Sequence, residues 1–108
     1  GDGFTMLKTI KQTVKQNLKM LILTNPGERV MIPKYGVGLK TFLFQPAGGS
    51  TQADIEQRIK DQVKTYMPVI RIKSVLVAPL ENTPTGLGIR LVYTIPNLAT
   101  GDILEITI

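Results

Sequence analysis

The chain has 108 residues, a formal net charge of +5 and a pI of about 9.7, and it contains no Cys, His or Trp. A chain of this length fits one domain, residues 1–108, around a single hydrophobic core. The missing residue types exclude a thiolate nucleophile, a Ser-His-Asp triad and any metal site built on His or Cys. Charged residues make up 19% of the chain, below the roughly 25% of average domains, so we expect extra apolar surface for a partner.

An amphipathic helix is predicted over residues 6–23. Its apolar residues recur every three or four positions, the spacing of one helical face; they are Leu7, Ile10, Val14, Leu18 and Leu21. Four lysines keep the same spacing beside that face, namely Lys8, Lys11, Lys15 and Lys19. This basic stripe is either a solvated flank of the helix or a surface for an acidic partner. The apolar stretch at 20–23 is too short for a membrane span or a secretion signal, which favours use in the cytoplasm and no membrane partner.

Turn signals follow this helix. Pro26 and Gly27 end it, because the residue before a proline avoids helical dihedrals and glycine permits positive φ. The apolar run at 30–32, closed by Pro33, predicts a short edge strand. A second turn at 35–38 leads into a predicted helical turn over 39–44. A loop at 46–49 precedes a second predicted helix, which presents one apolar face and ends before Pro68; that face comprises Ile55, Ile59, Val63 and Tyr66.

From residue 69 onward the apolar period changes to two, which is typical of strands. The apolar parity flips at Lys73 and Ser74, so this strand either contains a bulge or is buried on both faces. A turn at 82–88, a strand over 89–95, a loop at 96–102 and a last strand over 103–108 follow. The layout predicts an α+β fold, with two helices on a three- to four-stranded, mainly antiparallel sheet whose last strand leaves an open edge.

Carboxylate chemistry and nucleic-acid binding are the two alternatives to a structural role. A glycosidase needs two carboxyl groups across a sugar, and Glu28 has Asp54, Glu56 or Asp102 as possible partners. A turn hydrogen bond or an ion pair with Arg29 is the simpler explanation of Glu28. The high pI allows nonspecific binding to phosphates, but no aromatic residues are interleaved with the cations as in nucleic-acid modules. The glycines at 36 and 38 lack the third glycine of a nucleotide-binding loop.

Residues 21–46 carry a more specific signal. Their elements, in order, are Thr24, Gly27-Glu28-Arg29, Pro33, Tyr35-Gly36, Gly38-Leu39, Leu43-Phe44 and Pro46. This stretch resembles the baseplate-wedge family of contractile tails, often labelled tail lysozyme. That family includes subunits of phage baseplates and of type VI secretion and related injection machines. The resemblance breaks where the family carries Glu-Pro-Arg at a helix-to-strand junction, because this chain has Met67-Pro68-Val69 there. Either the wedge contact that the family makes with this triplet is altered, or Arg71 supplies the cation from the next strand.

The resemblance implies a structural subunit without catalytic residues, metal or cofactor. It implies assembly in the bacterial cytoplasm into the baseplate of a phage, prophage, tailocin or type VI-like machine. The implied partners are baseplate wedge proteins and the tail sheath subunit, whose assembly the domain nucleates, and not nucleic acid or membrane. The domain is then oligomeric only inside the assembled baseplate, and the alternative is a peptidoglycan-degrading tail lysozyme that uses carboxylates.

Three sets of contact residues are expected from the same resemblance. The signature loop comprises Gly27, Glu28, Arg29, Pro33, Tyr35, Gly36, Gly38 and Leu39. The helix-to-strand junction comprises Pro68 and Arg71. The sheet offered to the sheath consists of residues 89–95 and 103–108, and its edge comprises Ile103, Leu104, Glu105 and Ile106.

Overall fold

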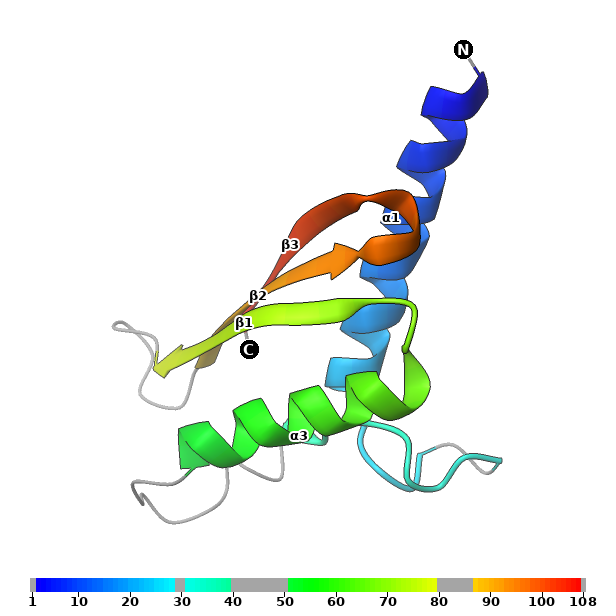
Figure 1. Ribbon diagram of the computed structural model, residues 1–108. Coiled ribbons are helices and arrows are strands. Elements are labelled where there is room, and N and C mark those ends of the chain that lie inside the picture. The colour runs from blue at the N-terminus through cyan, green and yellow to red at the C-terminus, as the bar shows by residue number, and fades with distance from the viewer. Residues whose placement is uncertain (1, 29–30, 40–50, 80–86, 108) are drawn as a thin grey trace.

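The computed structural model describes residues 2–28, 31–39, 51–79 and 87–107 (Figure 1). Two helices and three strands follow one another, with a short 3-10 helix before the last strand. They are α1 (Asp2–Leu23), α3 (Thr51–Tyr66), β1 (Arg71–Pro79), β2 (Leu87–Ile95), η1 (Pro96–Leu98) and β3 (Thr100–Thr107). Both helices cover one face of the sheet (Figure 1). The predicted α+β fold with an open-edged antiparallel sheet is therefore confirmed.

The sheet is an antiparallel meander in the order β1-β2-β3, so β2 is central and β1 and β3 are the edges. The register of β1 against β2 shifts between Ile72 and Ser74, which confirms the predicted bulge. The extra residue returns Val75 and Val77 to the helix-covered face that Ile72 already occupies, because a bulge resets the alternation of side chains.

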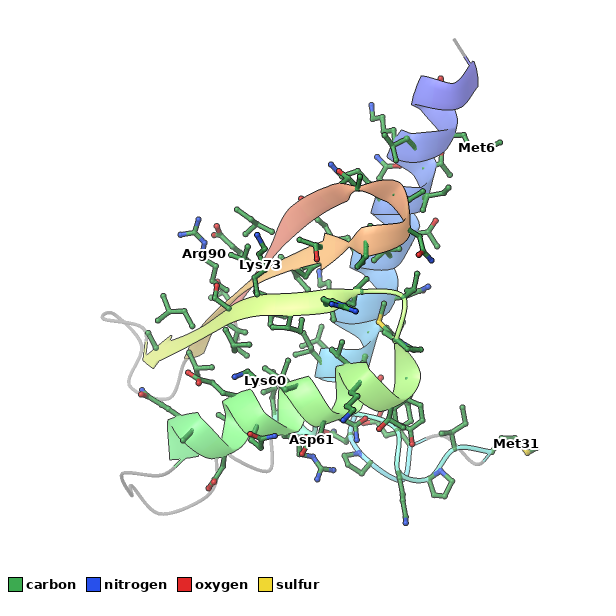
Figure 2. All side chains as sticks on the ribbon, in the orientation of Figure 1. Met6, Met31, Lys60, Asp61, Lys73 and Arg90 are labelled. Atoms are coloured by element: carbon green, nitrogen blue, oxygen red, sulfur yellow. The ribbon has the colours of Figure 1, made fainter. Side chains whose placement is uncertain are left out.

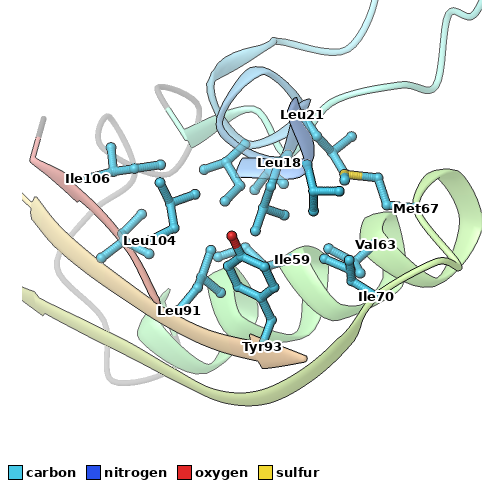
Figure 3. Close-up of a cluster of buried hydrophobic side chains, with 14 of the residues drawn as sticks. Leu18, Leu21, Ile59, Val63, Met67, Ile70, Leu91, Tyr93, Leu104 and Ile106 are labelled. Atoms are coloured by element: carbon cyan, nitrogen blue, oxygen red, sulfur yellow. The ribbon is translucent and has the colours of Figure 1, made fainter. Parts of the chain in front are cut away.

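One hydrophobic core lies between the helices and the sheet (Figure 3). Its fully buried members include Leu18 and Leu21 of α1, Ile59 of α3, and Leu91 and Tyr93 of β2. Among residues 5–23 of α1, the buried side chains begin at Val14. Further toward the N-terminus, Leu7 is partly buried and Ile10 is 37% exposed. The apolar face of α1 thus continues past the end of the core.

The predicted strand at 30–32 is wrong for the residues that the structure describes. Met31 and Ile32 lie in an irregular loop, and Met31 is 89% exposed and points into solvent (Figure 2). The main-chain N–H of Gly27 donates to the carbonyl of Pro33 at 2.9 Å, so the chain closes a loop here where a strand would pair with a neighbour. Val30 lies outside the described residues.

Several predicted boundaries also move. Residues 100–102 belong to β3 and not to the predicted loop at 96–102. The connection between β2 and β3 therefore consists of η1 and Ala99, whose φ is 50°. Likewise α1 begins at Asp2, and β2 begins at Leu87, inside the predicted turn at 82–88. Of the predicted helical turn at 39–44, Leu39 has helical backbone and the rest lies outside the described residues. Neither described helix is long and apolar enough to cross a membrane.

Candidate functional site

The signature loop is held against α3 by two polar side chains of that helix. The amide of Gln62 bridges the loop, because its Oε1 accepts the main-chain N–H of Gly36 at 2.8 Å and its Nε2 donates to the carbonyl of Lys34 at 3.0 Å. One turn earlier, Arg58 Nε donates to the carbonyl of Val37 at 3.1 Å. These bonds satisfy main-chain groups that form no strand or helix ladder, as partly buried polar groups require.

The same loop also closes the end of α1. The last carbonyls of a helix have no partner within it. Here the N–H of Val37 donates to the carbonyl of Leu21 at 3.1 Å, and the N–H of Gly38 donates to the carbonyl of Thr24 at 3.1 Å. The hydroxyl of Thr24 donates back to the carbonyl of Met20 at 2.6 Å. The loop thereby ties the end of α1 to α3.

Glycine is required at Gly36 for two separate reasons. Its φ of 118° lies in the region that L side chains rarely adopt. A Cβ at this position would also collide with the main-chain carbonyl of Thr24. Gly27 has a comparable φ of 93°, but no atom lies within 4 Å of its Cβ position. Backbone geometry therefore accounts for both glycines, and close packing accounts for Gly36 in addition.

The signature-loop residues divide into a buried and an exposed group. Leu39 is only 2% exposed, and the ring of Tyr35 packs edge-on against Tyr66 with centroids 5.2 Å apart. Glu28 and Pro33 are exposed, and Oε1 of Glu28 accepts a hydrogen bond from the side chain of Asn25 at 2.8 Å. Arg29 lies outside the described residues. Part of the predicted contact set is thus internal scaffold, and Gln62 and Arg58, its supports, gave no signal in the sequence beyond their helical spacing.

The helix-to-strand junction presents an exposed surface beside a buried methionine. Met67 is 8% exposed, and its N–H donates to the carbonyl of Val63 at 2.8 Å, which completes the last turn of α3. Pro68 and Arg71 are both exposed, and Val69 is 43% exposed. An apolar side chain thus enters the core at the position where the resembled family carries a glutamate.

The predicted sheet edge splits into two faces. Leu104 and Ile106 are 5% and 6% exposed and belong to the core, whereas Ile103 and Glu105 are exposed on the opposite face. The N–H of Ile103 donates to Oδ1 of Asp102 at 2.8 Å, so the main chain of Ile103 faces away from β2. Because main-chain direction alternates along a strand, the main chains of Glu105 and Thr107 face the open edge as well.

Asp102 links this edge to α1. Its Oδ2 lies 3.2 Å from Nζ of Lys15, and the two side chains are 24% and 41% exposed. Partial burial of the carboxylate raises its pKa, but the Ile103 N–H, the bond to Lys15 and the nearby charge of Lys11 outweigh that effect. The pKa of Asp102 therefore lies below its ordinary value of 3.8. The lysine stripe and the loop aspartate were each visible in the sequence, but not their pairing.

The carboxylates considered for acid–base catalysis are either paired with a nearby side chain or exposed to solvent. Glu28 is bonded to Asn25 and Asp102 is paired with Lys15. Asp54 is exposed and Glu56 partly so, both at the start of α3. Within the described residues, no three His, Cys, Asp or Glu side chains gather as a metal site would require. The pKa of Asp102 is lowered, whereas a general acid needs a raised pKa.

The whole sequence and fold were then compared with known proteins. A family model described as baseplate wedge protein gp25 matches residues 8–98, which is most of the chain. The chain belongs to the baseplate wedge protein gp25 family. This confirms the resemblance seen in residues 21–46. No curated protein matches the sequence.

Solved structures of other proteins share the fold. A protein from Geobacter sulfurreducens called a tail lysozyme is 25% identical, with a TM-score of 0.79 over 92% of this chain and 89% of that one. A chain of the anti-feeding prophage baseplate is 29% identical, with a TM-score of 0.69 over 77% of this chain and 66% of that one. A chain of the type VI secretion baseplate complex has a TM-score of 0.76 over 94% and 93%, but at 16% identity it shows the fold alone.

Proposed function

We propose that this gp25-family chain is a non-catalytic subunit that joins the baseplate wedge to the tail sheath and nucleates sheath assembly. The open edge of β3 is the observation that carries the proposal. The first sheath subunits add a strand to this edge, and the signature loop and the helix-to-strand junction contact the wedge proteins. The domain acts inside the baseplate of a contractile tail or a type VI-like machine.

An unpaired sheet edge is a template for another strand, since its main-chain N–H and C=O groups have no partner. On β3 the residues whose main chains face outward are Gly101, Ile103, Glu105 and Thr107, and the N–H of Ile103 is already bonded to Asp102. Charge protects this edge weakly: the exposed Glu105 lies 3.8 Å from the exposed Arg90 of β2, and such a pair contributes little. An incoming strand meets no lysine or proline on β3.

The other edge strand, β1, has several features that hinder pairing with an added strand. Strand β1 carries the bulge between Ile72 and Ser74, and it ends at Pro79. Arg71 and Lys73 add exposed cations along it, and Figure 2 shows Lys73 on this strand. Bulges, prolines and charges are the devices by which proteins block edge-to-edge pairing. The contrast between the two edges favours β3 as the strand that receives a partner.

A wedge contact is expected at the signature loop and the junction, apart from the open edge of β3. The exposed signature residues there are Glu28 and Pro33, and the junction adds Pro68 and Arg71. Glu28 is already oriented by Asn25, and among the residues that the structure describes its second carboxylate oxygen has no ion-pair partner. Glu28→Ala should then reduce incorporation of the chain into baseplates, whereas a role for Glu28 in turn geometry alone would leave incorporation unchanged.

A proline substitution at the open edge tests the sheath contact. Glu105→Pro removes an outward N–H and adds a ring without breaking a bond to β2, while Glu105→Thr removes the same charge and keeps the N–H. We expect Glu105→Pro baseplates to form without extended sheath, and Glu105→Thr baseplates to be sheathed normally. Mass spectrometry of isolated baseplates shows whether the variant chain is incorporated. Electron microscopy of tails from the source machine shows whether the sheath extends. Normal sheaths on folded Glu105→Pro baseplates would overturn the proposal.

A further inference from the structure

Helix α1 is longer than the sheet beneath it requires. Lys15 marks the point where α1 passes β3, because its ammonium meets Asp102 there. The helix continues for more than three turns toward Asp2, beyond the outer strand of the sheet (Figure 1). At 1.5 Å per residue, Lys11 and Lys8 lie about 6 and 10 Å past Lys15 along the helix axis. Neighbouring strands lie about 4.8 Å apart, so this stretch spans the positions of one or two added strands.

The part of α1 that precedes Lys15 is the projecting part of the helix. Its underside is apolar and basic. Leu7, Lys8, Lys11, Gln12, Lys15 and Asp102 line a hollow of about 350 Å³ between α1 and the start of β3. Leu7 is partly buried and Ile10 is 37% exposed, although both continue the apolar face that fills the core from Val14 onward. Three of the residues lining the hollow are cations and one is an anion, so the hollow keeps an excess positive charge.

We propose that the projecting part of α1 and the open edge of β3 form one seat for an added strand of the sheath subunit, a strand that is acidic and apolar on the side facing α1. This inference rests on the proposed strand addition and specifies its partner chemistry. The edge supplies main-chain hydrogen bonds, Leu7 and Ile10 cover the apolar side chains of the added strand, and Lys8 and Lys11 neutralise its carboxylates. Lys15 is paired with Asp102, whereas Lys8 and Lys11 form no ion pair with any side chain that the structure describes.

Charge complementarity of this kind acts on both specificity and association rate. The two lysines lie at the rim of the seat, where Lys8 is exposed and Lys11 partly buried, so salt should screen their effect. The apolar cover should be insensitive to salt, because burial of Ile10 against the added strand does not depend on ionic strength. The two contributions can therefore be separated by experiment.

A charge reversal on α1 tests the inference in assembled baseplates. Baseplates carrying Lys8→Glu and Lys11→Glu are titrated with the purified sheath subunit of the same machine. The matched control reverses Lys60 and Lys64, two exposed lysines of α3 with the same change in net charge. We expect the α1 reversal to raise the sheath concentration for half-maximal extension about tenfold at low salt and less at high salt, and the control to change it less than twofold. Ile10→Ser should weaken extension about threefold at every salt concentration.

The outcomes separate this inference from the proposed function. If Glu105→Pro abolishes sheath addition while the α1 reversal behaves like the α3 control, the inference that the added strand is acidic is wrong and the proposed edge contact stands. Equal loss in both charge reversals would reflect the net charge of the chain and would also overturn the inference. If neither Glu105→Pro nor the α1 reversal affects the sheath, both proposals are wrong. Restoration of extension when the α1 reversal is paired with an acidic-to-lysine change in the sheath strand would support the seat directly.

Discussion

The carboxylate of Asp102 lies 3.2 Å from the ammonium of Lys15, and this pair fixes α1 across the open edge of β3. The other carboxylate oxygen accepts the N–H of Ile103, one of the outward donors of that edge. One side chain thus positions the helix and satisfies part of the edge. A strand that adds to β3 finds its free donors further along, at Glu105 and Thr107.

Removal of the charge at residue 102 should make folding less sensitive to acid. The folded-state pKa of Asp102 lies below its value in the unfolded chain, so the carboxylate stabilises the fold above that unfolded value. This stabilisation is lost as the pH falls through the folded pKa. Because both partners are partly solvated, Asp102→Asn should lower the free energy of unfolding by at most about 1 kcal/mol at neutral pH. Urea unfolding over a pH series measures this difference, which should shrink below the ordinary pKa of 3.8.

A Lys15→Met variant and the double variant complete the cycle for the same pair. The double variant should lose less stability than the sum of the single changes, since each single change already breaks the pair. If the two single losses of stability added strictly at neutral pH, the assigned role of the ion pair would be contradicted. A loss of stability in Asp102→Asn that did not shrink in acid would contradict it as well.

Tyr93→Phe should leave stability unchanged or raise it by up to about 1 kcal/mol. Tyr93 is 1% exposed, and its hydroxyl has no hydrogen-bond partner among the described residues. An unsatisfied buried hydroxyl costs free energy that phenylalanine avoids. A loss of more than about 2 kcal/mol in urea unfolding would show that the hydroxyl has a partner after all.

The same tyrosine should make the stability of the fold fall at alkaline pH. Burial, together with the charge of Asp102 opposite it in the sheet register, raises the pKa of Tyr93 to about 12. The folded value lies above the ordinary value of 10.0, so the stability that depends on the neutral phenol is complete below pH 10.0 and is lost as the pH rises through about 12. Tyr93→Phe should lose less stability than the natural chain over that range, and an identical alkaline decline in both proteins would contradict this assignment.

Gly36→Ala should be far more damaging than Gly27→Ala. Both positions have positive φ, which costs an alanine roughly 1–2 kcal/mol. Only at Gly36 does the added methyl group meet a backbone carbonyl, that of Thr24, in the contact that joins the loop to α1. We expect a loss of about 3 kcal/mol or more at Gly36 and about 1 kcal/mol at Gly27 in urea unfolding. Equal losses would mean that the loop does not pack on α1 as described.

Periodicity was enough to predict the helices and the strands, because each buries one face against a common core. The parity flip at Lys73 and Ser74 located the bulge for the same reason. The run at 30–32 has strand-like residues, but the bond from Gly27 to Pro33 closes a loop, and a loop-closing main-chain bond leaves no periodic pattern in the sequence.

The candidate site was predictable only in part. The glycine spacing and the family motif located the signature loop, but not its dependence on Gln62 and Arg58 of α3. Four lysines share one stripe, and sequence alone could not show that Lys15 meets Asp102, because that pair depends on how α1 crosses the sheet.

Hydrogen exchange on baseplates before and after sheath addition tests the central claim most directly. In the free baseplate, the amides of Glu105 and Thr107 should exchange rapidly, since their main chains face the open edge. We predict that sheath addition slows exchange in the peptide that covers β3 at least tenfold and leaves the peptide that covers β1 unchanged. Unchanged exchange in β3 on sheathed baseplates, or new protection confined to β1, would contradict the account.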